Sequence, residues 1–235
     1  MQLRAINATD GTEIWTILDY GNIMYGGVTP VADGYLVTLN TYDSQIYSYG
    51  KGPSALTVEA PKASIELSKS LVISGMVTDV SAGTKQNEQA ARFPNGVPAV
   101  SDASQSAWME YVYMQKPRPT NAIGVPVTID VIDSNGNYRN IGTATSDSSG
   151  AFSYQWTPDI SGKYTVIATF ADSESYWPSS AETSFAVDPS APTPSPYTVA
   201  TLPPTEMYII GTGIAIIIAI AIVGALMLLA IKKRP

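Results

Sequence analysis

The chain has 235 residues, a formal net charge of −7, and neither cysteine nor histidine. These absences exclude disulfides, thiolate nucleophiles and histidine as a general base or metal ligand. The acidic balance disfavours a nucleic-acid partner, while 18 Gly, 17 Pro and 14 Tyr suit short strands joined by tight turns.

Residues 1–52 show the pattern of four short strands. The predicted strands are 3–6, 13–18, 35–39 and 45–49, and Asp10-Gly11 and Asp33-Gly34 supply turn residues between them. Four strands in about 50 residues match one blade of a β-propeller.

Part of this segment resembles a known repeat. Residues 5–15, AINATDGTEIW, are similar to the repeat of PQQ-type quinoprotein β-propellers, in which a turn glycine precedes a docking tryptophan by four positions. Those positions are Gly11 and Trp15 here, and Asn7 replaces the usual acidic residue. Residues 31–37 and 45–49 resemble the outgoing strands of the next repeat. The alternative is an unrelated hairpin with a core tryptophan.

The resemblance implies a four-stranded blade, which needs neighbouring blades to bury its faces. We therefore expect residues 1–52 to be the remnant of a larger propeller whose earlier blades precede this sequence. A quinone cofactor is not implied, because in quinoproteins residues of many blades hold it. Asn7-Ala8-Thr9 is a possible glycosylation acceptor.

Residues 51–54 predict a linker, and residues 53–188 have the alternation and turn spacing of an immunoglobulin-like β-sandwich. Leu71, Ile73 and Val77 are expected to face inward, and Pro126 to mark a strand entry or an edge. Residues 133–137 predict a hairpin turn, since Ala144 stands where a calcium loop needs a bidentate acid. The predicted strands are 56–59, 64–67, 70–80, 125–132, 138–145, 151–156, 163–170 and 182–187.

Four motifs in this block resemble the Ig-like, fibronectin-like modules of large bacterial and archaeal surface proteins. They are GVPV at 124–127, DSSG at 147–150, WTP at 156–158 and SGKYTV at 161–166. The resemblance implies the sandwich fold and implies that Tyr164 forms a corner or core contact. It identifies no function, because this fold hosts many.

An insertion at 81–121 interrupts the sandwich pattern. A short helix is predicted over 85–91, and the alternation of 108–115 predicts an added strand. Loops of this length are often functional. Trp108, Tyr111 and Tyr113 are therefore the candidate partner surface. The alternative is that these aromatic side chains belong to the core.

The C-terminal segments predict a stalk and a membrane anchor. Residues 189–207 are proline-rich and should be extended. Residues 208–231 predict a transmembrane helix, since 209–231 carry no charge and are long enough to cross a bilayer. Gly211, Ala215 and Ala219 repeat every four residues, a spacing that permits homo-oligomers.

The basic tail at 232–235 predicts the orientation. Lys232, Lys233 and Arg234 should remain cytoplasmic, which places the N-terminal domains outside the cell. Residues 1–20 contain no apolar run of the signal-peptide type. We therefore expect a precursor segment upstream, a misassigned start, or a tail anchor that leaves the β-domains in the cytoplasm. The first is preferred.

The sequence thus predicts an all-β protein with propeller-blade-like strands, an Ig-like sandwich and one C-terminal transmembrane α-helix. The expected function is that of a non-enzymatic, single-pass cell-surface protein in adhesion, a surface layer or a scaffold. The expected partners are the lipid bilayer and other surface proteins or glycans. No catalytic, cofactor-binding or metal-binding residue is predicted. The alternative is the tail of a membrane-anchored quinoprotein-like propeller enzyme or its scaffold subunit.

Overall fold

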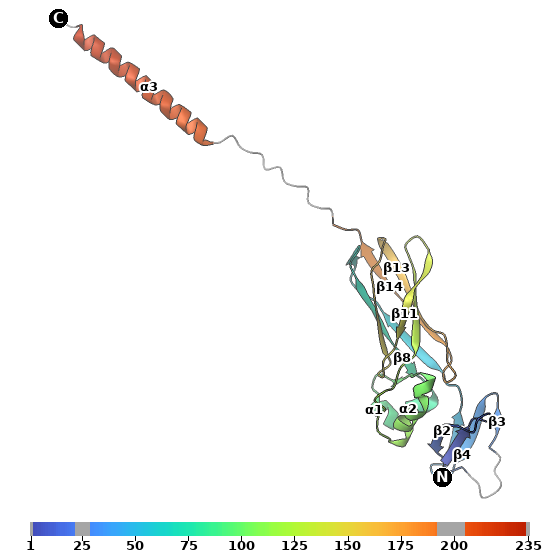
Figure 1. Ribbon diagram of the computed structural model, residues 1–235. Helices are drawn as coiled ribbons and strands as arrows, with labels where there is room; N and C mark the ends of the chain where they lie inside the picture. The colour runs from blue at the N-terminus through green and yellow to red at the C-terminus, as the bar shows by residue number, and fades with distance from the viewer. Residues whose placement is uncertain (1, 22–28, 192–204, 234–235) are drawn as a thin grey trace. The chain divides into compact units, whose positions relative to one another are not determined.

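The computed structural model describes residues 2–21, 29–191 and 205–233. It comprises a β-rich unit up to residue 191 and a C-terminal unit that holds helix α3, Thr205–Lys232 (Figure 1). Most of the predicted stalk and Arg234 lie outside the described residues.

Two packed sheets form the larger part of the β-rich unit. Its strands are β6 (Ser54–Glu59), β7 (Ile65–Glu66), β8 (Leu71–Asp79), β9 (Val97–Pro98), β10 (Pro126–Ile132), β11 (Tyr138–Thr145), β12 (Ala151–Trp156), β13 (Gly162–Phe170) and β14 (Ser179–Asp188). One sheet has the order β11-β10-β13-β14-β7, and the other has the order β12-β8-β6 with β9 beside β8. The predicted all-β sandwich is confirmed.

The core lies between these two sheets. Leu71, Ile73 and Val77 of β8 are buried, as alternation predicts, and Pro126 is the first residue of β10, where a missing N–H is tolerated. Position 75 requires glycine because the backbone of β6 lies close to it. A Cβ there would lie 1.9 Å from the Thr57 carbonyl oxygen.

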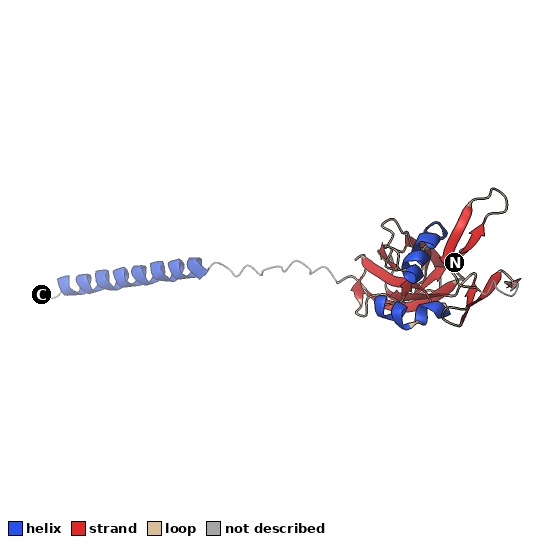
Figure 2. Ribbon diagram, turned by 90° about the horizontal axis from the view of Figure 1, so that it is seen from below, coloured by secondary structure: helices blue, strands red, loops and turns tan. Residues whose placement is uncertain are grey.

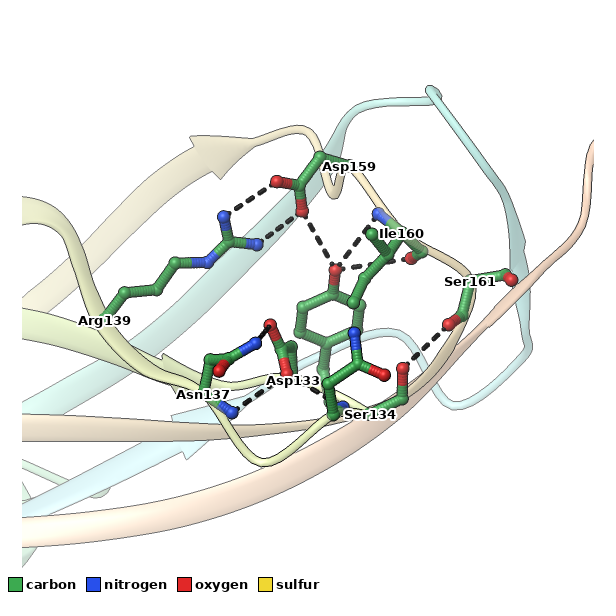
Figure 3. Close-up of polar contacts among 9 residues, drawn as sticks. Asp133, Ser134, Asn137, Arg139, Asp159, Ile160 and Ser161 are labelled. Atoms are coloured by element: carbon green, nitrogen blue, oxygen red, sulfur yellow. Dashed lines mark hydrogen bonds and ion pairs between the residues drawn. The ribbon is translucent and has the colours of Figure 1, made fainter.

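Tyr164 forms the predicted corner with Asp159 and Ile160, which are labelled in Figure 3. Its side chain is fully buried, and its ring stacks on Phe185 with centroids 5.4 Å apart. The hydroxyl donates to the Asp159 carboxylate at 3.2 Å and accepts the Ile160 backbone N–H at 3.3 Å. Asp159 also pairs with the guanidinium of Arg139, so the corner is tied to β11.

The predicted hairpin turn between β10 and β11 is also confirmed. The Asp133 carboxylate accepts the backbone N–H groups of Asn135 and Asn137 at 2.8 and 3.0 Å, and the Asn137 side-chain amide at 3.0 Å. These hydrogen bonds, that from the Asn137 side chain first, lower the pKa of Asp133. Its oxygens therefore hold the turn itself.

The N-terminal strands form two small sheets. They are β1 (Gln2–Ile6), β2 (Glu13–Leu18), β3 (Val31–Ala32), β4 (Tyr35–Asn40) and β5 (Gln45–Tyr49). β1 pairs with β2, β3-β4-β5 form a second sheet, and a bridge between Gly21 and Asn40 joins the two. The four predicted strands exist, but the described ones do not make a single four-stranded blade. Alternation identifies strands and does not specify their neighbours.

Helices occupy the insertion (Figure 2). A 3₁₀ turn, η1 (Ala82–Lys85), precedes α1 (Asn87–Arg92), and α2 spans Asp102–Met114. The predicted short helix is confirmed with a small shift. The predicted strand at 108–115 is wrong, because Trp108 and Val112 lie on one side of α2 and bury fully in a second small core with Val97 and Val100.

The C-terminal end of β14, the last strand of the sandwich, is held by hydrogen bonds to β7 and the residues beside it. Val187 and Asp188 pair in parallel with Ile65 and Glu66 of β7. The backbone N–H of Leu67 donates to the Asp188 carbonyl at 2.9 Å, and that of Ala191 donates to the Glu66 carboxylate at 3.3 Å. Residues 188–191 are therefore held laterally against the start of the sandwich.

Helix α3 covers the predicted transmembrane segment and extends it by a few residues at its start. Within the described part of the chain it is the one helix long and apolar enough to cross a membrane, and none of its residues is buried. The Thr212 hydroxyl donates to the Tyr208 carbonyl at 2.8 Å, so the polar group near its start is satisfied within the helix.

Candidate functional site

Three segments meet at one end of the sandwich and form the candidate site, which we call the junction. They are residues 51–54, the insertion, and the loop 172–177. Gly52 accepts the Trp177 N–H at 2.8 Å and donates its own N–H to the Ser175 carbonyl at 2.9 Å. The predicted linker is therefore bound to this loop.

Side chains at the junction connect β4 to the sandwich. The Lys51 ammonium lies 2.9 Å from the Asp172 carboxylate and 4.6 Å from the centre of the Trp177 ring. Trp177 Nε1 donates to the Tyr35 hydroxyl at 3.2 Å, and that hydroxyl donates to the Lys51 carbonyl at 2.8 Å. An aromatic ring, a cation and a carboxylate are thus held in one exposed array.

The first turn of α2 docks on the same loop. The Asp102 carboxylate accepts the N–H groups of Ser175 and Glu174 at 2.9 and 3.1 Å. Burial alone would raise the pKa of Asp102, but these hydrogen bonds lower it below its ordinary value. Gln105, one turn later, accepts the hydroxyl of Tyr176 at 3.2 Å.

The other end of α2 is held by α1. The Arg92 guanidinium donates to the carbonyls of Tyr111 and Val112, both at 2.9 Å, and lies 4.7 Å from the centre of the Tyr111 ring. A cation at carbonyls that lack intrahelical partners stabilises a helix C-terminus. The insertion is therefore a compact helical lobe.

The three aromatic residues of the predicted partner surface are separated by this arrangement. Trp108 is fully buried, Tyr111 is half-buried beneath Arg92, and Tyr113 is 40% exposed. Trp108 thus contributes no exposed area, and the alternative placement in a core holds for it. Of the three, Tyr113 offers the most surface to a partner.

A cavity of about 350 Å³ lies beside the junction. Its lining includes Lys51, Ser101, Asp102, Asp172 and Glu174. Of these, Lys51 is paired with Asp172, and Asp102 accepts the backbone N–H groups of Glu174 and Ser175.

The remaining predicted residues lie away from the junction. Gly11 has φ +76° in the turn between β1 and β2, and the Trp15 ring centre lies 6.0 Å from that of Tyr49 on β5. The Asn7 side-chain oxygen accepts the Thr9 N–H at 2.9 Å. Lys232 ends α3 and Lys233 follows it.

A buried carboxyl group lies where the insertion leaves the sandwich. Asp79 is 5% exposed at the end of β8 and accepts the Ser81 N–H at 2.8 Å. Burial raises the pKa of Asp79. Burial, and then the charge of Asp79, also raise the pKa of Tyr113 and Tyr176. Alternation along β8 predicts an inward side chain at this position, and an acid there is a departure from the apolar pattern.

Replacing Asp79 with asparagine is expected to change how stability depends on pH. The unfolded chain loses its Asp79 proton near pH 3.8, whereas the folded protein keeps it to higher pH. The wild type therefore loses stability relative to Asp79→Asn as the pH rises from about 4 through the raised pKa of the folded protein, by about 1.4 kcal/mol for each unit of pKa elevation. Urea unfolding at several pH values measures this difference.

Asp102→Asn is the matched control with the opposite sign. The pKa of Asp102 is lowered in the folded protein. Asp102 therefore adds to the free energy of unfolding above the pKa of the unfolded chain, and this stabilisation is lost as the pH falls through the pKa of the folded protein. A wild type and an Asp79→Asn variant with parallel pH profiles would contradict the role assigned to Asp79.

Comparison with protein-family models and with curated proteins gives no match. Among solved structures, the fibronectin(III)-like modules of Clostridium thermocellum CbhA align with a TM-score of 0.32 and 13% sequence identity. The alignment covers 68% of this chain and 64% of that one, so this chain spans less than two thirds of the length of that structure.

Proposed function

We propose that this chain is a non-enzymatic, single-pass membrane protein of the cell surface that presents its β-rich unit to other surface proteins or glycans. The observation that supports this is the character of α3. The helix is apolar on all sides and buries no residue among the described parts of the chain. A helix of this kind needs an apolar environment, and a bilayer supplies it.

The proposed orientation rests on the charges that flank α3. Lys232 and Lys233 stand at its C-terminal end, whereas Glu206 stands in its first turn. Cationic flanks are retained in the cytoplasm. By this rule, the proposed location of the β-rich unit is outside the cell. Gly211, Ala215 and Ala219 give α3 a side on which two copies of the helix can approach closely.

The β-rich unit would serve as the binding part. Its support is the junction, where Trp177 is 47% exposed beside the pair of Lys51 and Asp172.

Protease treatment of intact cells tests this function. With an epitope tag after residue 235, added protease should remove the β-rich unit and leave a short protected fragment that carries the tag and α3. Permeabilised cells, in which the tag is also digested, are the control. A protected β-rich unit with a digested tag would show the opposite orientation and refute the surface assignment.

A further inference from the structure

Exposed apolar side chains are concentrated in the N-terminal sheets. Thirteen large ones are exposed in the described β-rich unit, and eight of these belong to the first 50 residues. The eight are Ile6, Ile14, Leu18, Tyr20, Val31, Leu39, Tyr42 and Ile46. Concentrated apolar exposure marks interaction surfaces, whereas scattered single residues do not.

The most continuous part is one face of β4 and β5, which we call the outer face. Leu39 and Ile46 are cross-strand partners and are 48% and 75% exposed. The next pair on the same face is Val37 with Ser48. The opposite face is covered, since Thr38 is buried and Tyr49 contacts Trp15.

The outer face continues to a strand edge. In the described residues β5 pairs with β4 alone, and its register with β4 has no irregularity. The strand QIYSY contains no proline, no lysine and no other charge, which are the residues that usually protect an edge. An edge of this kind accepts an extended segment as an additional strand.

The charges around the outer face indicate which kind of segment would bind there. Asp33 and Asp43 are exposed in the turns that precede β4 and β5. The first 50 residues hold five acidic residues and a single cation, Arg4, whose Nε lies 3.2 Å from the Glu13 carboxylate. If a second copy of this chain bound here, its acidic residues would repel those around the outer face, whereas a cationic segment would be attracted to them.

We propose that the outer face and the edge of β5 bind an extended segment of a partner protein in which apolar residues alternate with lysine or arginine. Its apolar side chains lie beside Ile46, whose partner on β4 is Leu39, and its cations reach Asp33 and Asp43. The binding mode is the addition of a strand to the sheet.

Labelled ten-residue peptides and the full chain in nanodiscs of zwitterionic lipid test this proposal, with empty nanodiscs as background. The probes are a Val-Lys repeat and a Val-Glu repeat. The Val-Lys peptide should bind about tenfold or more tightly than the Val-Glu peptide, and added salt should reduce the difference. Equal binding of the two peptides, or binding of neither, overturns the proposal.

Variants test whether the Val-Lys peptide binds to the outer face. Leu39→Ser with Ile46→Ser should weaken binding of the Val-Lys peptide about tenfold, and Ile46→Lys, which adds a like charge at an exposed position, should weaken it at least as much. Val72→Ser is the matched control, because Val72 is 53% exposed on β8 of the sandwich, and binding should be unchanged. An equal loss in the control overturns the assignment. Self-association of the wild type that Leu39→Ser with Ile46→Ser abolishes would instead identify a second copy as the occupant.

Discussion

Two aspartates in the middle of α3, Ile217→Asp with Ile218→Asp, are expected to release the chain from the membrane fraction. Each carboxylate at the centre of a spanning helix costs about 3 kcal/mol, so the pair costs about 6 kcal/mol. Both positions are more than half exposed on the described helix, and no partner within the described chain shields them. Alkaline carbonate extraction should move the variant from the pellet to the supernatant.

Ile217→Leu with Ile218→Leu is the matched control and should remain in the pellet, because it changes shape and not polarity. A wild type found in the supernatant would contradict the anchor. So would aspartate and leucine variants that partition alike.

Replacing Trp108 with alanine is expected to unfold the helical lobe of the insertion and to leave the sandwich folded. Trp108 is fully buried in a cluster with Val97, Val100 and Val112, which is separate from the main core. Removing a buried tryptophan costs about 3–5 kcal/mol. Hydrogen exchange should show lost protection in α1 and α2, with protection retained in β10, β13 and β14.

Two further variants calibrate this effect. Trp108→Phe should cost much less, because it keeps most of the buried area and removes an indole N–H that has no hydrogen-bond partner among the described residues. Tyr113→Ala should also be mild, since that side chain is 40% exposed. Equal loss of protection in the sandwich and in the insertion would show that the two cores unfold as one.

The sandwich could be predicted because burial alternates from one residue to the next along its strands. Ile73 and Val77 of β8 alternate with less buried positions, and turn residues such as Asp133 and Gly136 separate the strands. The corner at Tyr164 was implied by the resemblance to Ig-like modules, and it forms with Asp159 and Ile160, five and four residues upstream. Local patterns fix local structure.

The structure of the insertion was harder to predict, because its sequence fits both the two-residue period of a strand and the 3.6-residue period of a helix. Tyr111 and Tyr113 take alternate positions, with Val112 between them, as on the two faces of a strand, yet Trp108 and Val112 are also four apart as on a helix. Ser101 and Asp102, just before the segment, are residues typical of a helix start and favour the second period.

The junction was not predictable for a different reason. Its contacts join Lys51 with Asp172 and Tyr35 with Trp177, more than 100 positions apart in the chain. No local pattern specifies such pairs. The burial of Asp79 depends on the same assembly, because the insertion and the loop around Tyr176 cover it.

The fastening of residues 188–191 to β7 has a mechanical consequence. A force that pulls on the chain beyond residue 191 reaches the sandwich along β14. There it meets the parallel pairing of Val187 and Asp188 with β7, together with the Leu67 and Ala191 hydrogen bonds. For a pull along the axis of β14, these bonds lie across the force and share the load, so they resist together before β14 can peel from the sheet. The sandwich should bear tension at this exit better than an end attached by one bond at a time.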